Sequence, residues 1–178
     1  MLFFSFINEA PNYSNINLRV WLNQSAKEES CIRTALEDES IIFIAWSKVT
    51  FQHFQDLFRK RNINNKIMIA NDVFGLKSQG SKFVLIERHY DHDKESKLIK
   101  YLNAKNIIVH ISLSDPIMSA FNSVRMQKVR EKFRNIKNEY IEHRMINSSI
   151  EKAMTKISNG DWPEENSKII LEWIEGID

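Results

Sequence analysis

Residues 111–157, ISLSDPIMSAFNSVRMQKVREKFRNIKNEYIEHRMINSSIEKAMTKI, decide the fold that we predict for this chain. An apolar strand end leads into Asp115-Pro116, which favours a helix start because the Asp side chain accepts from free backbone N–H groups and Pro fixes φ. Apolar residues then recur at spacings of three and four, which predicts two amphipathic helices. The two stripes are Met126, Val129, Phe133, Ile136 and Tyr140, and then Ile146, Ile150, Ala153, Met154 and Ile157. Asn159-Gly160 is placed to end the second helix through a left-handed residue at Gly160.

Upstream of this stretch, short apolar runs alternate with helical patterns. β-branched and aromatic residues fill the runs at 41–46, 67–70, 83–86 and 107–111, which is typical of strands buried on both faces. Between them the pattern predicts a helix capped by Thr50 and another over residues 95–102 with Asp93 as its cap. Strands and helices in this alternation favour an α/β fold, a parallel sheet flanked by helices, with amphipathic helices at the C-terminal end.

The N-terminal part predicts further elements of the same kinds. Leu2 to Ile7 is a candidate buried strand, Leu18 to Leu22 alternates as a second short strand, and Ser25 can cap a helix running to about Glu37. We therefore divide the chain into an N-terminal extension (1–40), an α/β core (41–114) and a helical extension (115–178). We expect these parts to form one compact domain, because 178 residues suffice for a substantial core.

Composition limits the classes of function. Apolar residues make up 43% and charged residues 27%, which is typical of a globular protein. The 25 Lys and Arg side chains nearly balance 23 Asp and Glu, so overall charge does not predict a polyanionic partner. A single cysteine excludes an internal disulfide framework. The apolar start lacks a basic segment and no run approaches the roughly 20 residues of a bilayer span, so we expect a cytoplasmic protein without membrane insertion.

Three groups of residues could carry chemistry. Gly75 to Lys82 has the glycine spacing of a phosphate-binding loop, but Ser and Lys are transposed and a strand follows it, so we expect no nucleotide there. The cluster His89, Asp91, His92 and Asp93 offers metal ligands, yet a solvated loop and helix start explains it better. Cys31, His53, His110 and His143 stand apart from one another in the sequence and are expected to be packed or surface residues. We predict no catalytic residue, no metal and no cofactor.

The opening stretch resembles the end of the second nucleotide-binding domain of the SecA preprotein-translocase motor, running into that motor's helical scaffold. The resemblance implies a helicase-C-like, RecA-like α/β core, and residues 41–70 are similar to its opening strand, helix and strand. The segments concerned are Ser112-Leu113-x-Asp115-x-x-Met118-x-x-Phe121, Ile141-Glu142-His143, Ile150-Glu151-x-Ala153-x-x-Lys156-Ile157 and, as the counterpart of the family's ERH, Glu87-Arg88-His89.

The sequence departs from this family where ATP would be bound. After Glu87-Arg88-His89 the family has RGRSGRQGD, whose arginines reach the phosphates, whereas this chain continues YDHDKESKLIKYLNAKNI. The family's TIATNMAGRGTD segment and its Walker A and B motifs are also absent from the given sequence. Phosphoryl transfer depends on positioning and charge stabilisation by such groups. The resemblance therefore implies a degenerate domain, a pseudo-ATPase, and we expect that it is not an enzyme.

Two hypotheses about function remain. The first is a non-catalytic SecA-like adaptor or accessory subunit, possibly in protein secretion, that contacts a protein partner through the amphipathic helix over 164–175. The residues proposed for this contact are Trp162, Ile170, Trp173 and Ile174, with Trp173 as the anchor. The alternative is a nucleic-acid-binding, helicase-derived domain that uses a run of basic residues, although such a run is also what a solvated helix face looks like. That run comprises Arg125, Lys128, Arg130, Lys132, Arg134 and Lys137.

Overall fold

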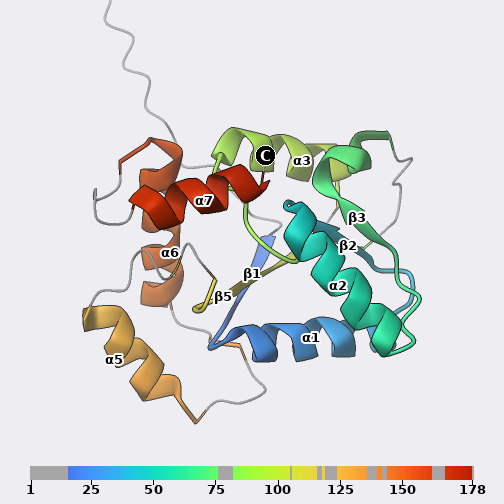
Figure 1. The fold of residues 1–178 in the computed structure, drawn as a ribbon, viewed down its shortest axis with the longest axis horizontal. Helices are drawn as coiled ribbons and strands as arrows, with labels where there is room; N and C mark the ends of the chain where they lie inside the picture. Colours follow the sequence, from blue (N-terminus) through green and yellow to red (C-terminus); the bar gives the residue numbers. More distant parts are fainter. Residues whose placement is uncertain are drawn as a thin grey trace, which may run out of the picture.

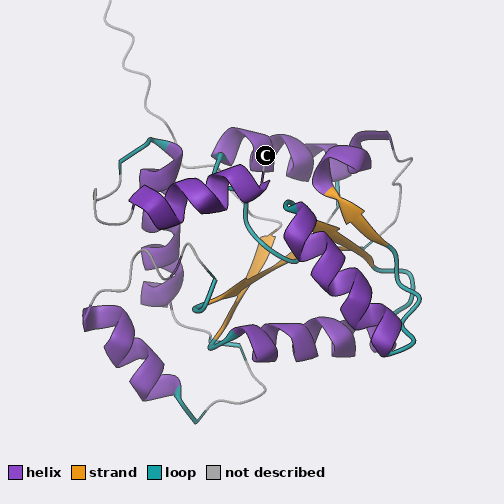
Figure 2. Ribbon diagram, viewed as in Figure 1, coloured by secondary structure: helices purple, strands orange, loops and turns teal. Residues whose placement is uncertain are grey.

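A computed structural model of the chain describes residues 16–75, 82–104, 106–115, 118, 124–135, 140–141, 144–161 and 167–177. Five parallel strands form one sheet in the order β1-β5-β4-β2-β3 (Figure 2). The strands are β1 (Ile16–Trp21), β2 (Ile42–Ala45), β3 (Ile67–Ile69), β4 (Phe83–Leu85) and β5 (Ile107–Ser112). The predicted parallel α/β architecture is thus confirmed.

Strand β1 joins the N-terminal part to this sheet. It pairs along its whole length with β5, so that Leu18 lies beside Val109. The sheet therefore crosses the predicted boundary at residue 40. The strand predicted over Leu2 to Ile7 lies outside the described residues.

Helices cover both faces of the sheet (Figure 1). They are α1 (Gln24–Glu37), α2 (Lys48–Lys60), the 3-10 helix η1 (Ala70–Gly75), α3 (His92–Leu102), α5 (Val124–Phe133), α6 (Arg144–Ser158) and α7 (Ser167–Ile177). Neighbouring strand residues point to opposite faces. Phe43 packs with Phe54 of α2, whereas Ile44 packs with Leu98 of α3. This is why the strands are apolar on both sides. Among the described helices, none is long and apolar enough to cross a membrane.

Three helices begin two or three residues earlier than predicted. Asn, Ser and Asp are all good N-caps, so pattern alone does not choose between two candidates close together. At α2, the structure gives the reason, because the Thr50 hydroxyl donates to Glu87 and the Ser47 side chain accepts from the Thr50 N–H. The observed caps are Asn23, Ser47 and Asp91, where the sequence predicts Ser25, Thr50 and Asp93.

Helix α6 packs on the face that carries α3, whereas α7 contacts both the α6 core and α2. The predicted stripe of α6 is confirmed, since its five apolar residues are all buried. Gly160 has φ +70°, and the Asp161 N–H donates to the Lys156 carbonyl, so the predicted left-handed end of α6 is also correct.

The helix before α6 is shorter than predicted. Helix α5 ends at Phe133, and both Val129 and Phe133 pack partly buried against the core below α6. Tyr140 is not helical and meets the Trp21 ring edge-on at 5.9 Å. The Ile141 N–H beside it donates to the Val20 carbonyl, so the chain there lies along the outer edge of β1. Ile136 and the side chain of Met126 lie outside the described residues.

We predict that Ile150→Ala lowers the free energy of unfolding by roughly 2–5 kcal/mol, because it leaves a cavity in the core under α6. Ile150 is 1% exposed. The control is Lys132→Ala on α5. Lys132 is exposed, and the contact described for its ammonium is with the Phe133 ring, whose centroid lies 5.5 Å away. It should change stability by less than about 1 kcal/mol. Urea unfolding measures both variants, and equal, negligible losses would mean that α6 does not pack on the sheet.

A second prediction concerns His110, which is fully buried in β5 and accepts a 2.7 Å hydrogen bond from the Trp21 indole N–H. Burial, with smaller contributions from Arg19 and Lys27, lowers the pKa of His110 to about 3, from its ordinary 6.5. Between these two pH values the unfolded chain binds a proton that the folded chain does not. The stability is therefore complete above about pH 6.5 and decreases as the pH falls.

The expected loss is about 2 kcal/mol between pH 7 and pH 5, measured by urea unfolding. His110→Gln keeps a carbonyl that can accept from Trp21 but removes the titration, so its stability should depend less on pH. Other titrating groups, including Glu87, are present in both proteins and cancel in the comparison. Identical pH dependence of the two proteins would contradict the prediction.

Candidate functional site

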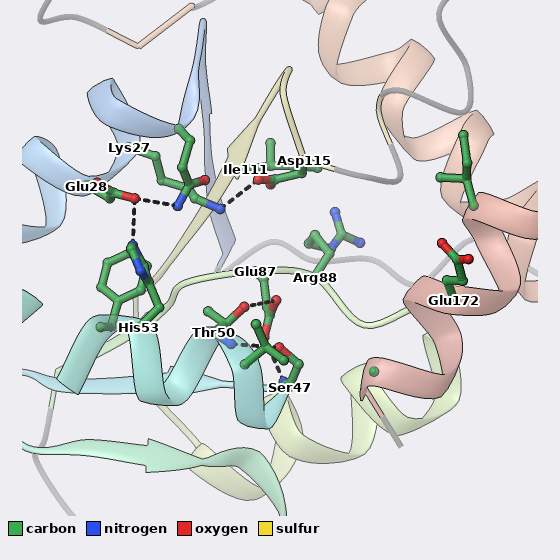
Figure 3. Close-up of a pocket in the computed structure, with 15 residues that line it drawn as sticks. Lys27, Glu28, Ser47, Thr50, His53, Glu87, Arg88, Ile111, Asp115 and Glu172 are labelled. Carbon is green, nitrogen blue, oxygen red and sulfur yellow. Dashed lines mark hydrogen bonds and ion pairs between the residues drawn. The ribbon is translucent and has the colours of Figure 1, made fainter. Parts of the chain in front are cut away.

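The sheet has its topological switch point between β2 and β4. Helix α2 follows β2 on one face, and α3 follows β4 on the other. In α/β sheets, ligands bind at the carboxyl ends of the strands beside such a point. A cavity of about 480 Å³ opens at this edge (Figure 3), within the size range of small-molecule sites. Its polar lining includes Lys27, Glu28, Thr50, His53, Glu87 and Asp115.

The carboxylate of Glu87 lies at the start of α2. Its Oε1 accepts from the backbone N–H groups of Trp46 and Ser47, at 2.9 and 2.7 Å. Its Oε2 accepts from the Thr50 hydroxyl at 2.7 Å (Figure 3). Burial raises the pKa of Glu87 above its ordinary value, and the hydrogen bonds from Ser47 and Thr50 and the charge of Lys27 offset only part of this rise. Every partner here is a donor, and a helix N-terminus favours negative charge, so this arrangement suits an ionised carboxylate.

The next residue, Arg88, reaches the helices on the other face. Its guanidinium is 3% exposed and binds both carboxylate oxygens of Glu95 in α3, with the shortest contact at 2.7 Å. It also donates to Glu151 of α6 at 2.7 Å. Burial by itself would lower the pKa of Arg88, but the two carboxylates raise it above its ordinary value, so the side chain stays charged. Glu151 and Arg88 both belong to segments that carry the SecA resemblance.

An ion pair and a contact between a histidine and a carboxylate also line the cavity. Lys27 of α1 is 4% exposed and binds Asp115 at 2.8 Å. Asp115 also accepts from the Ser112 N–H, so its carboxylate fixes the turn that follows β5. Glu28 meets His53 at 2.7 Å, and the His53 side chain is half exposed. The described Lys and Arg side chains of the cavity wall, Lys27 and Arg88, are therefore each paired with a carboxylate.

Helix α7 covers part of the cavity. Ile169, Glu172 and Gly176 line it, and Figure 3 shows Glu172 projecting from α7 beside it. Two residues of the predicted partner contact face the protein core. Ile170 is fully buried, and Ile174 is partly buried, in the core that α6 covers. A partner could not reach Ile170 without displacing α7. Among the described side chains of α7, the exposed large apolar ones are Ile169, at 40%, and Leu171, at 47%. Trp162 and the side chain of Trp173 lie outside the described residues.

The basic run of the alternative hypothesis is only partly described. Lys128, Lys132 and Arg134 are exposed on and just after α5. Arg130 is half-buried and donates to the Leu113 carbonyl, so part of its role is structural. The side chain of Arg125 and all of Lys137 lie outside the described residues. Nucleic-acid binding through this run stays a prediction.

The other candidate residues have structural contacts. His89 is buried and its Nδ1 accepts from the Asp91 N–H at 2.8 Å, while Asp91 caps α3. Within the described residues, no three His, Cys, Asp or Glu side chains are grouped to hold a metal ion. Cys31 is a core residue, and burial raises the pKa of its thiol to about 12, which disfavours the nucleophilic thiolate. His143 and residues 76–81 of the glycine-containing loop lie outside the described residues.

Sequence reasoning missed the residues that organise this cavity. In the sequence Glu87 stands out only as part of a motif, and no pattern marks Lys27. One signal for Glu87 was available, because a carboxylate just after a strand lies at the edge where a neighbouring helix begins. Lys27 gave no such signal, since a lysine on a helix is usually exposed.

Comparison with known proteins supports the resemblance in part. No protein-family model matches the chain. The protein translocase subunit SecA of Bacteroides fragilis is 25% identical to it over 122 residues. That match covers 60% of this chain and 11% of the SecA protein, so the chain spans about a tenth of the length of that relative. A SecA-like region in an α/β domain is what the sequence and structure together support.

Proposed function

We propose that this chain is a non-catalytic, SecA-like module that works through protein–protein contacts, as an adaptor or accessory subunit in protein secretion. The observation that carries the proposal is the exposure of Ile169 and Leu171 on α7, whose other side is already buried through Ile170. The two residues are two positions apart on the helix and therefore lie on different sides of it. Ile169 borders the cavity, so the contact that we propose is centred on the more exposed Leu171. The similarity to a protein translocase subunit supports the secretion context.

The charge arrangement supports the non-catalytic part of the proposal. An enzyme that transfers phosphoryl groups needs cations aimed at the phosphates. At this edge Arg88 is held by Glu95 and Glu151, and Lys27 is held by Asp115. Breaking a buried pair leaves an uncompensated charge and costs roughly 3–5 kcal/mol. These cations are therefore poorly suited to leave their partners for a nucleotide.

For nucleotide, we predict no ATP hydrolysis and no stabilisation by Mg-ATP. A ligand at a hundredfold excess over its Kd would add about 2.7 kcal/mol to the stability, which a melting curve detects easily. Lys82→Ala serves as the specificity control, because Lys82 is the lysine of the glycine-containing loop and binds Asp38 at 2.6 Å. A clear rise of Tm with Mg-ATP that disappears in Lys82→Ala would contradict the proposal.

For the partner, we predict that Leu171→Glu removes recovery of a bound protein in affinity purification from the native host while leaving Tm nearly unchanged. The matched control is Leu36→Glu on α1, because Leu36 is 66% exposed and lies on another helix. A partner identified by mass spectrometry should be lost only with Leu171→Glu. Equal recovery with both variants would count against the α7 contact. Binding to nucleic acid that weakens steeply with salt, without a protein partner, would favour the alternative.

A further inference from the structure

The start of α2 has the features of an anion-binding position. Two successive backbone N–H groups, of Trp46 and Ser47, point at one oxygen, and the Thr50 hydroxyl points at a second. Successive N–H groups at a helix N-terminus are the usual way in which proteins bind phosphate. The position lies at the switch point of the sheet, where phosphate groups bind in many α/β proteins.

In this chain that position already holds an anion. Both oxygens are those of the Glu87 carboxylate, which comes from the segment that follows strand β4 and not from α2 itself. The donor–acceptor distances of 2.7 to 2.9 Å are typical of charge-assisted hydrogen bonds. The three donors are therefore already occupied and have no room for a second anion. The side chains of Glu87, Ser47 and Thr50 also line the cavity of about 480 Å³, as does Lys27. Removal of the Glu87 carboxylate would therefore open the donors at the start of α2 to the cavity, which is large enough for a phosphate to enter.

We propose that the Glu87 carboxylate is a built-in substitute for a bound phosphate, which fills the anion position at the start of α2 and closes it to free phosphate and to phosphate esters. This inference deepens the proposed lack of nucleotide binding, and it does not depend on the protein partner.

The test is the melting temperature of Glu87→Ala in sodium phosphate and in sodium chloride of equal ionic strength. The variant should melt below the wild type in chloride, because the donors of Trp46, Ser47 and Thr50 lose their acceptor. Phosphate at tenfold excess over its Kd should raise the Tm of the variant by about 3 to 6 °C, and ³¹P NMR should report binding. The wild type should show neither effect.

Two further variants make the result decisive. Glu87→Gln keeps a side-chain oxygen in place and should remain insensitive to phosphate, whereas Glu87→Ser vacates the position and should respond as Glu87→Ala does. Phosphate binding to the wild type at this position would overturn the proposal. So would a folded Glu87→Ala or Glu87→Ser that phosphate does not stabilise, or failure of both to fold even in phosphate. Loss of the partner contact through Leu171 would leave this outcome unchanged, so the two proposals can fail separately.

Discussion

The buried guanidinium of Arg88 is the constraint on which the packing of the C-terminal half depends. A buried positive charge is tolerated only when carboxylates surround it, and Arg88 takes one from α3 and another from α6. The Glu95 contact is bidentate and fixes the plane of the guanidinium. Glu151, 63 residues further along the chain, must then lie where the remaining guanidinium N–H groups can donate to it. The position of α6 over the sheet is thus set by one charged group as well as by its apolar stripe.

Consecutive residues after β4 serve opposite faces of the sheet. Strand periodicity sends neighbouring side chains to different sides, so Glu87 reaches the start of α2 while Arg88 reaches α3 and α6. His89 then stays buried and packs edge-on against Trp46 at 4.5 Å. A motif that looks in sequence like a site for phosphate chemistry is used here to join the layers of the domain. This use accounts for its presence without the arginine-rich segment that follows it in SecA.

The sequence predicted the fold better than it predicted the cavity, and the reason is the range of the interactions involved. Strands and the α6 stripe follow from burial patterns within a few residues, and the end of α6 follows from Gly160 alone. The pairing of Lys27 with Asp115 joins residues 88 apart, and no local pattern indicates it. The start of α2 lies between these cases. Ser47 and Thr50 are both acceptable caps, and only the carboxylate of Glu87, from the segment after β4, decides which of them caps the helix.

The electrostatics of the carboxyl edge fit a domain that uses this edge for cohesion. Each strong charge described there meets its counterpart inside the chain: Glu87 meets the N–H groups of α2, Arg88 meets two carboxylates, and Lys27 meets Asp115. A ligand that relied on any of them would have to displace an internal partner, which costs free energy before binding begins. Binding to the outer side of α7 would not require an internal ion pair to be broken. Leu171 is exposed there, and its burial would only remove apolar surface from water. A contact at the outside of α7 would therefore cost less electrostatic free energy than a contact at the carboxyl edge.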